Sequence, residues 1–133
     1  MTKVAKKVLC IEDNSVNMLL VSRIVEAEGH KLIKAEDGPA ALDILGGVVP
    51  DIILLDINLP GINGLELARH IKADDKLAAV PLIATTAQVL VGDRERCLEA
   101  GCDDYLPKPL EIRKLREVLR YHLNGDLRLE IRE

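Results

Sequence analysis

The chain has 133 residues, 48% of them hydrophobic and 30% charged, a composition typical of one folded domain rather than of a disordered chain. A formal net charge of −4 argues against nucleic acid as a partner, because phosphate binding needs a basic face. The apolar stretches fall well short of the roughly 20 residues of a membrane span, and residues 1–13 do not have the pattern of a signal peptide. We therefore expect a cytoplasmic protein with no membrane partner.

The three cysteines cannot all pair within one chain. Cys10 and Cys97 lie in segments of apolar periodicity, and Cys102 follows a glycine that suits a helix end. Disulfides are rare in the cytosol, so we expect three reduced thiols. The three histidines are isolated in sequence, and we expect them at the surface rather than as metal ligands: His30, His70 and His122.

Short apolar runs alternate with segments of helical periodicity along the chain. In chain order, the pattern predicts a strand at 8–11, a helix at 15–28, a strand at 31–35, a helix at 38–47, a strand at 51–56, a helix at 64–72, a strand at 80–86, a helix at 90–100, a strand at 104–106 and a helix at 110–123. We expect each of four helices to pack one apolar row on the core: Val16, Leu19, Leu20, Ile24 and Ala27; Ala41, Ile44 and Leu45; Leu67, Ala68 and Ile71; and Ile112, Leu115 and Leu119.

Five strand–helix pairs predict one α/β domain over residues 1–124. The strand runs lack polar alternation, which is typical of parallel strands that are buried on both faces. We therefore expect a doubly wound, five-stranded parallel sheet of the flavodoxin-like kind, with strand order 2-1-3-4-5. Residues 125–133 form a short tail in which apolar and charged residues alternate, and this tail either pairs with a sheet edge or frays.

Carboxylates end two of the expected strands. Glu12 and Asp13 follow the first strand, and the apolar run at 52–55 leads directly into Asp56. The predicted fold places these two strand ends side by side, at the point where ligands bind in open parallel sheets. Like charges about 4 Å apart repel by roughly 4 kcal/mol at an effective dielectric of 20. A divalent cation removes that repulsion, and Mg²⁺ is the hard cation that a few carboxylates commonly hold.

Two further polar residues end the fourth and fifth strands. Thr86 offers a hydroxyl donor, Lys108 offers a mobile ammonium, and the small Ala87 leaves room beside them. Carboxylates, a metal ion, an ammonium and a hydroxyl make a site suited to phosphoryl transfer, where positioning and charge neutralisation provide most of the catalysis. Asp56 is the expected nucleophile and would form an acyl phosphate.

Four short strings, "LCIEDN", "LLDINLPGINGLEL", "ATTA" and "DYLPKP", carry a resemblance to a known family. Thr86 follows Asp56 by 30 residues, and Lys108 follows Thr86 by 22. With these motifs in this order, residues 6–123 resemble the receiver domain of two-component response regulators. The chain looks most like the single-domain receivers of cell-division control.

The resemblance implies a role for each matching residue of the metal site. Asp56 is the phosphoacceptor, and Asp13 and Asp56 ligate Mg²⁺ directly together with the backbone carbonyl of Asn58. Glu12 acts largely through a bound water. The glutamate at position 12 is a common variation of the family's second aspartate.

The resemblance also implies a switch. Thr86 and Lys108 hold the phosphoryl group, Tyr105 turns inward as Thr86 moves, and the Lys108–Pro109 peptide is cis. The domain would accept its phosphoryl group from a histidine kinase or a histidine phosphotransfer protein. It would then change how the face made by the fourth helix, fifth strand and fifth helix binds a downstream protein or a second copy of itself. Such a domain catalyses only its own phosphorylation and dephosphorylation, and we expect it to act without an output domain.

Other readings remain open at this point. An aspartyl phosphatase of the haloacid-dehalogenase kind needs a second acid two residues after its nucleophile, where this chain has Asn58, and it needs room for a cap domain. A phosphorylation-independent scaffold would not need the full polar set, and a nucleotide-binding module would need a glycine-rich loop after the first strand. Structural roles are also available: Asp13 as a helix cap, Thr86 as a strand residue, Lys108 as a solvated loop residue and Tyr105 as core filler.

Overall fold

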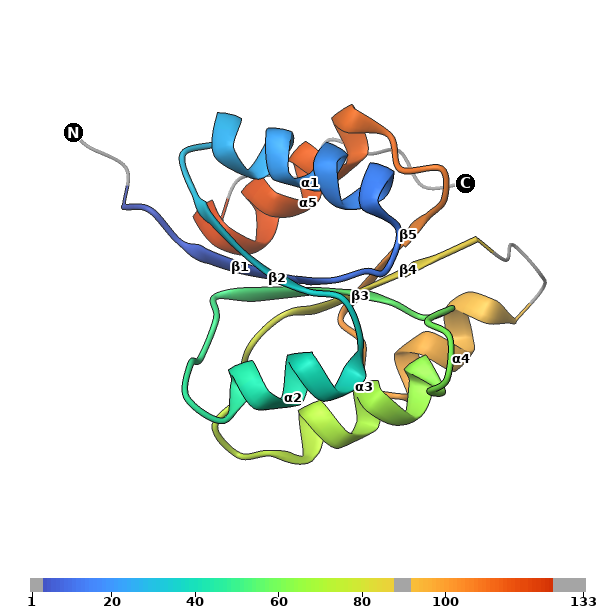
Figure 1. Ribbon diagram of the computed structural model, residues 1–133. Helices are drawn as coiled ribbons and strands as arrows, with labels where there is room; N and C mark the ends of the chain where they lie inside the picture. The colour runs from blue at the N-terminus through green and yellow to red at the C-terminus, as the bar shows by residue number, and fades with distance from the viewer. Residues whose placement is uncertain (1–3, 88–91, 126–133) are drawn as a thin grey trace.

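The computed structural model describes residues 4–87 and 92–125, which form five strands and five helices in strict alternation (Figure 1). The elements are β1 (Lys7–Ile11), α1 (Ser15–Ala27), β2 (Lys31–Ala35), α2 (Gly38–Leu45), β3 (Ile52–Asp56), α3 (Gly64–Ala73), β4 (Leu82–Thr86), α4 (Asp93–Glu99), β5 (Asp104–Pro107) and α5 (Ile112–Asn124). Every expected element is present, and the bounds agree within three residues wherever the expected bounds fall on described residues.

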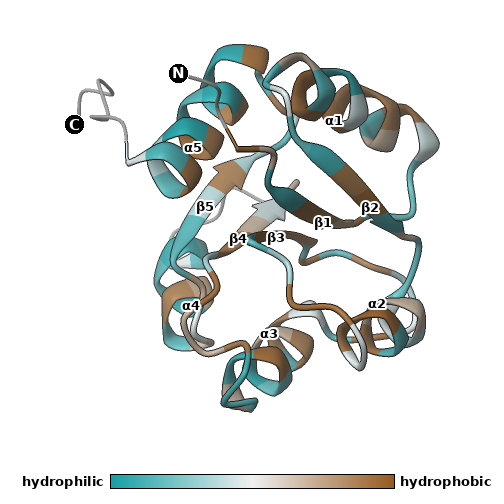
Figure 2. Ribbon diagram, turned by 90° about the vertical axis from the view of Figure 1, so that its left-hand side faces the viewer, coloured by the Kyte–Doolittle hydropathy of each residue, from teal (hydrophilic) through white to brown (hydrophobic). Residues whose placement is uncertain are grey.

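The strands form one parallel sheet in the order β2-β1-β3-β4-β5, as predicted. Helices α1 and α5 cover one face of the sheet, and α2, α3 and α4 cover the other (Figure 1). Both faces of β3 and β4 are therefore buried, which explains why their sequences are apolar without alternation. Figure 2 shows the hydrophobic central strands and the hydrophilic outer sides of the helices.

Successive residues of β1 pack into two separate core layers. Val8 and Cys10 pack with the residues of α1 and α5, whereas Leu9 and Ile11 pack with those of α2, α3 and α4. This division follows from the period of two along a strand. At roughly 25 cal/mol per Å² of buried apolar surface, the two layers are the main source of stability of the domain.

The buried face of α1 differs from the predicted one. Val16 and Leu19 are 73% and 54% exposed, and Ala27 is also exposed. Ile24 is buried as predicted and Leu20 is partly buried, but the other α1 residues that pack on the sheet are Met18, Val21 and Val25. The helix carries apolar residues on two adjacent rows of equal spacing, so periodicity alone cannot choose between them.

The predicted face of α5 is wrong at one position. Ile112, the first residue of the helix, is 52% exposed, whereas Leu115 and Leu119 are buried as expected and Val118 completes the row. The predicted inward rows of α2 and α3 are confirmed, with the Ile44 side chain partly buried.

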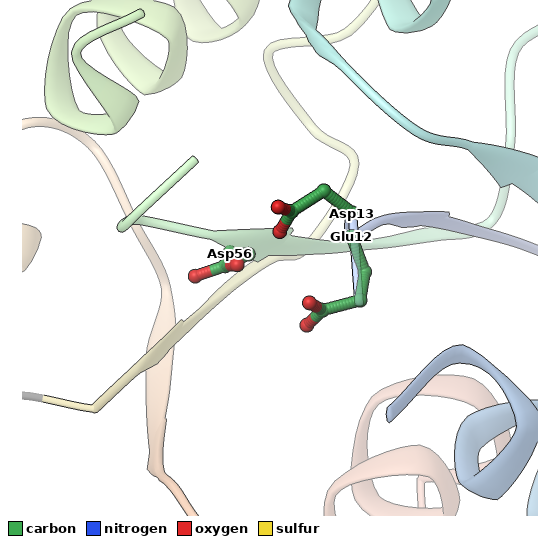
Figure 3. A group of neighbouring side chains, drawn as sticks. All are labelled: Glu12, Asp13 and Asp56. Atoms are coloured by element: carbon green, nitrogen blue, oxygen red, sulfur yellow. The ribbon is translucent and has the colours of Figure 1, made fainter. Parts of the chain in front are cut away.

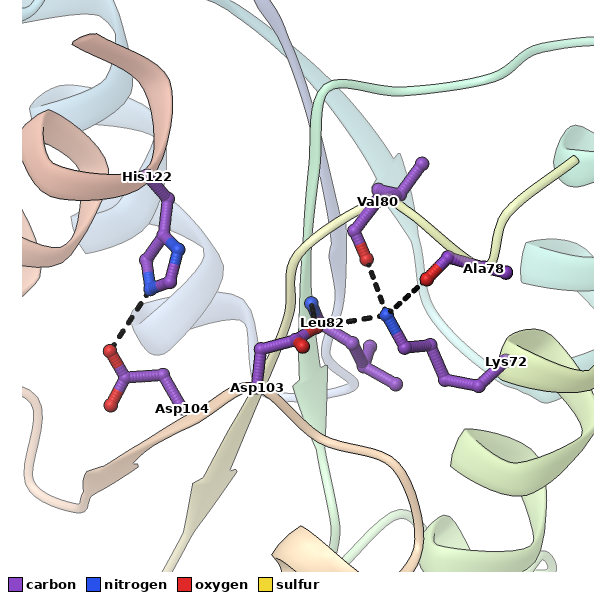
Figure 4. A network of polar contacts seen from close by, with 7 residues as sticks. All are labelled: Lys72, Ala78, Val80, Leu82, Asp103, Asp104 and His122. Atoms are coloured by element: carbon purple, nitrogen blue, oxygen red, sulfur yellow. Dashed lines mark hydrogen bonds and ion pairs between the residues drawn. The ribbon is translucent and has the colours of Figure 1, made fainter. Parts of the chain in front are cut away.

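Two of the three histidines are not at the surface. His30 is 5% exposed, and its Nδ1 accepts a hydrogen bond from the Lys6 backbone N–H at 3.0 Å. The His122 Nε2 lies 3.0 Å from Asp104 Oδ2, and both side chains are largely buried (Figure 4). His70 is exposed, as expected. Each buried ring lies where a helix or its following turn packs on a strand end, a contact that isolated sequence positions do not reveal.

The three cysteines are buried free thiols, as expected. Burial raises the pKa of Cys10 and of Cys102 to about 12. None of the helices in residues 4–87 and 92–125 combines the length and the apolar character that a membrane span requires. The tail at 126–133 and the predicted start of the fourth helix at residues 90 and 91 lie outside the described residues.

Candidate functional site

The ends of β1 and β3 bring the predicted carboxylates together. Ile11 pairs with Leu55 in the sheet, so Glu12 and Asp56 are the next residues on neighbouring strands. Both are only 3% exposed, whereas Asp13 is exposed. One carboxylate oxygen from each of these three residues lies within 4.8 Å of the others, and the side chains point into the same space (Figure 3).

Lys108 is the positive charge of this cluster. Its Nζ lies 3.0 Å from Glu12 Oε1 and 3.1 Å from Asp56 Oδ2, and its backbone N–H donates to the Thr86 carbonyl at 2.8 Å. Burial alone would lower the pKa of Lys108, but the hydrogen bonds and charges of the two carboxylates outweigh it, so the pKa is raised above its ordinary value. The reading of Lys108 as a solvated loop residue is therefore wrong. The Lys108–Pro109 peptide is cis, as expected.

The second oxygens of the buried carboxylates accept backbone hydrogen bonds. Glu12 Oε2 accepts from the Asn14 N–H at 3.0 Å, and Asp56 Oδ1 accepts from the Asn58 N–H at 2.9 Å. Asn14 in turn caps α1, because its side chain accepts from the Asn17 N–H at 2.9 Å. Asp13 is thus not the helix cap, and its carboxylate is left to face the cluster. Three carboxylates against one ammonium leave an excess of negative charge at the site.

The turn after β3 is held by a close backbone contact. A Cβ on Gly64 would lie 2.4 Å from the Ile57 carbonyl oxygen, so only glycine fits where α3 begins. Gly61 has φ +77°, a conformation that other residues rarely adopt, and Asn63 caps α3 through the Leu65 N–H at 2.9 Å. The two glycines therefore serve the turn, and the turn fixes the backbone beside Asp56.

Thr86 lies at the end of β4, with 3% of its surface exposed. Its hydroxyl oxygen is 3.2 Å from the side-chain oxygen of Asn58, which also accepts the Ala87 N–H at 3.0 Å. This contact of the Asn58 side chain was not predicted, because only the backbone carbonyl of Asn58 was expected to take part in the site. The available signal was an amide side chain two residues after the strand-end carboxylate.

Tyr105 lies on β5, away from the carboxylate cluster. It is partly buried and packs against the core layer under α2, α3 and α4. Burial raises its pKa, and the nearby charge of Asp93 raises it further. A small hollow of about 150 Å³ between the ends of β3 and β4 and the first turns of α4 is lined by Thr86, Asn58 and Cys97, among others. The switch role of Tyr105 stays a prediction.

Comparison with known proteins agrees with this architecture. The model of the response regulator receiver domain family matches residues 8–120. The polar-differentiation response regulators DivK of Brucella anthropi and Brucella ovis are 40% identical over 121 residues, which are 91% of this chain and 98% of each relative.

Solved structures are similar in the same way. The receiver domain of the sensor histidine kinase PA1611 from Pseudomonas aeruginosa, solved with a magnesium ion coordinated in its active-site cleft, is 35% identical with a TM-score of 0.82 over 91% of this chain and 99% of that one. The signal receiver domain of a signal transduction histidine kinase from Syntrophus aciditrophicus is 29% identical with a TM-score of 0.83, over 97% of this chain and 98% of that one. The chain belongs to the response regulator receiver domain family of two-component signalling.

Proposed function

We propose that this chain is a phosphorylatable switch whose phosphoacceptor is Asp56. The observation that carries the proposal is the position of Asp56, a buried carboxylate at a strand end that shares Lys108 with Glu12. Residues 1–124 would form the receiver, and residues 125–133 a tail. The phosphodonor would be a phosphohistidine on a histidine kinase or a phosphotransfer protein in the cytoplasm.

The donor set fits Mg²⁺, because it consists of clustered hard oxygen atoms with excess negative charge. Asp13, Asp56 and the Asn58 carbonyl would hold the ion, with Glu12 acting through water. When bound, Mg²⁺ neutralises the carboxylates and the charge on the transferred group.

The residues of this chain then have simple tasks in the transfer. An oxygen of Asp56 attacks phosphorus as the phosphorus–nitrogen bond of the donor breaks, and the imidazole nitrogen leaves with the electron pair and takes up a proton. Lys108, which already contacts Asp56, would form an ion pair with the phosphoryl oxygens as they receive negative charge. Thr86 donates its hydroxyl to the same group from the end of β4.

The switch would operate through Thr86 and Tyr105. Movement of Thr86 toward the phosphoryl group would leave space between β4 and α4, and the Tyr105 ring would turn into it. The face of α4, β5 and α5 would then bind a downstream protein, or a second copy, differently. The exposed Val16 and Leu19 lie on α1 next to Asp13, and they offer an apolar surface on which a histidine-bearing helix could dock.

The test is intact mass after incubation with Mg²⁺ and a small-molecule phosphodonor such as acetyl phosphate. We expect a gain of about 80 Da for one phosphoryl group in the wild type, dependent on Mg²⁺ and absent in Asp56→Asn. Asp75→Asn, which changes an exposed aspartate far from the site in sequence, is the matched control and should still gain the mass.

Failure to see an adduct has two explanations that beryllofluoride distinguishes. If the acyl phosphate hydrolyses quickly, the wild type still binds beryllofluoride with Mg²⁺ and Asp56→Asn does not. If the folded wild type gains no phosphoryl group and does not bind beryllofluoride, the proposed function is wrong and the chain is a scaffold with a receiver fold.

A further inference from the structure

The side chain of Asn58 bridges the ends of β3 and β4. Its Oδ1 lies 3.2 Å from Thr86 Oγ1 and 3.0 Å from the Ala87 backbone nitrogen. The backbone N–H of Ala87 can only donate, so the amide must present its oxygen to it, and the Thr86 hydroxyl then donates to that same oxygen. We call this pair of contacts the Asn58 latch.

A phosphoryl group on Asp56 would need the same two donors. Asp56 pairs with Thr85 in the sheet, so Thr86 and Ala87 are the next residues along the neighbouring strand, beyond the level of Asp56. A group added to the Asp56 carboxylate extends in that direction, past the end of β3. Its oxygens would therefore come within reach of the Thr86 hydroxyl and the Ala87 N–H, where the Asn58 oxygen now lies.

We infer that the Asn58 side chain is an internal competitor of the phosphoryl group, which holds Thr86 and Ala87 in the resting state. The inference rests on the proposed function of Asp56 and assigns a positioning role to a side chain two residues away. A neutral amide oxygen makes weaker hydrogen bonds than a charged phosphoryl oxygen, so the phosphoryl group displaces it. The displacement lowers the apparent affinity of the site, because only the open latch is competent.

The size of the effect follows from the exposure of the latch. The hydrogen bond from Ala87 is exposed and the one from Thr86 is partly buried, and because Asn58 itself is exposed, water can reach the amide oxygen. Two neutral hydrogen bonds of this kind reduce the competent fraction by about fivefold, toward the lower end of what such bonds contribute. Because Asn58 lies at the surface, its replacement leaves the core intact.

The first experiment tests the latch without phosphate or metal. Hydrogen exchange of the Ala87 amide is followed by NMR in wild type, in Asn58→Leu, which has no acceptor, and in Asn58→Asp, which keeps an oxygen in place. We expect roughly fivefold faster exchange in Asn58→Leu. In Asn58→Asp we expect exchange no faster than in the wild type, because a carboxylate oxygen accepts at least as strongly as an amide oxygen. The Asn14 amide at the same sheet edge is the internal reference. Equal exchange in wild type and Asn58→Leu would mean that there is no latch.

The second experiment tests competition. Beryllofluoride is titrated into wild type and Asn58→Leu at saturating Mg²⁺, after calorimetry has shown equal Mg²⁺ affinity. We expect about fivefold tighter binding in Asn58→Leu. Equal or weaker binding would overturn the inference while leaving Asp56 as phosphoacceptor. If neither protein binds beryllofluoride, the proposed function fails, and the exchange data still decide whether the latch contact exists.

Discussion

The two ends of the sheet use the same kinds of side chain in opposite ways. At the carboxyl end, Glu12, Asp13 and Asp56 gather around the ammonium of Lys108. At the amino end, a single ammonium, that of Lys72, meets acceptors that match its three donors. Its Nζ lies 3.0 Å from the Ala78 carbonyl, 2.8 Å from the Val80 carbonyl and 2.9 Å from Asp103 Oδ2 (Figure 4).

The amino-end network is closed on itself. Asp103 Oδ2 also accepts the Leu82 N–H at 2.8 Å, so the carboxylate ties the start of β4 to the start of β5 while Lys72 ties both to α3. A network in which all three donors of the ammonium are satisfied stabilises the fold. The carboxyl end keeps unbalanced negative charge, which opposes folding and is relieved only by a cation. Departures from local balance of this sort are expected at functional sites.

The largest effect should come from breaking the amino-end network. In Lys72→Met, two backbone carbonyls and Asp103 lose their common donor, and we expect the free energy of unfolding to fall by about 2–3 kcal/mol. Asp103 is 42% exposed, which keeps the loss below that of a fully buried pair. Urea unfolding measures it, with the exposed Lys76→Met as a control that should stay within about 0.5 kcal/mol. Equal losses in the two variants would show that the network is not stabilising.

The carboxyl end should respond to metal instead. Mg²⁺ at a hundredfold excess over its dissociation constant should stabilise the wild type by about 2.7 kcal/mol, because it binds only the folded state. Asp13→Asn removes a proposed ligand and should lose most of this stabilisation, while its metal-free form should be no less stable than the wild type. Thermal unfolding with and without Mg²⁺ measures both effects. The amino-end variant Lys72→Met should keep the full Mg²⁺ response, and a weaker response there would couple the two ends.

The residues at the carboxyl end of the sheet were predictable from sequence, because each of them follows a recognisable local pattern. Asp56 closes an apolar run, Glu12 and Asp13 close another, and the alternation of elements assigns both ends to one sheet edge. Lys108 and Thr86 are found in the same way. Each inference needed only one strand and the general topology.

The amino-end network and the Asn58 latch were not predictable on those grounds. Lys72 and Asp103 are 31 residues apart, and Lys72 looked like any charged residue late in a helix. Asn58 and Thr86 meet only because β3 and β4 are neighbours in one register. The prediction of the buried face of α1 failed for a related reason, since two apolar rows with equal spacing differ only in how the helix is rotated on the sheet. Contacts between elements depend on relative placement, which local patterns do not contain.

We expect the backbone of the turn after Asp56, at the carboxyl end of the sheet, to tolerate substitution poorly. In Gly64→Ala, the new Cβ would lie 2.4 Å from the Ile57 carbonyl, so the turn after Asp56 has to shift. We expect a loss of about 2 kcal/mol in the free energy of unfolding and a weaker Mg²⁺ response, because the Asn58 carbonyl moves with the turn. Gly47→Ala, where a Cβ has open space, is the matched control and should be neutral or slightly stabilising.

The smallest expected effect is the loss of stability at high pH that is caused by two buried thiols, one near each end of the sheet. Cys10 lies two residues before Glu12, and Cys102 directly precedes Asp103. Burial raises both pKa values from an ordinary 9.0 to about 12, so the folded chain keeps protons that the unfolded chain releases above pH 9. Raising the pH therefore favours unfolding, and between pH 8 and 10 each thiol should remove about 1 kcal/mol of stability.

Chemical unfolding at a series of pH values measures this slope. The window ends at pH 10 because Lys108, whose pKa is raised above an ordinary 10.5, contributes a loss of the same sign only at higher pH. Cys10→Ala and Cys102→Ala should each flatten the slope by a similar amount, whatever their effect on stability at pH 8. If Cys10 and Cys102 contribute similar slopes, the two ends of the sheet differ in the balance of their exposed charges and not in how deeply the thiols beneath them are buried. Cys97, whose pKa burial also raises above an ordinary 9.0, should leave a residual slope of the same sign after both substitutions. A slope that neither substitution flattens would show that other groups cause the alkaline loss.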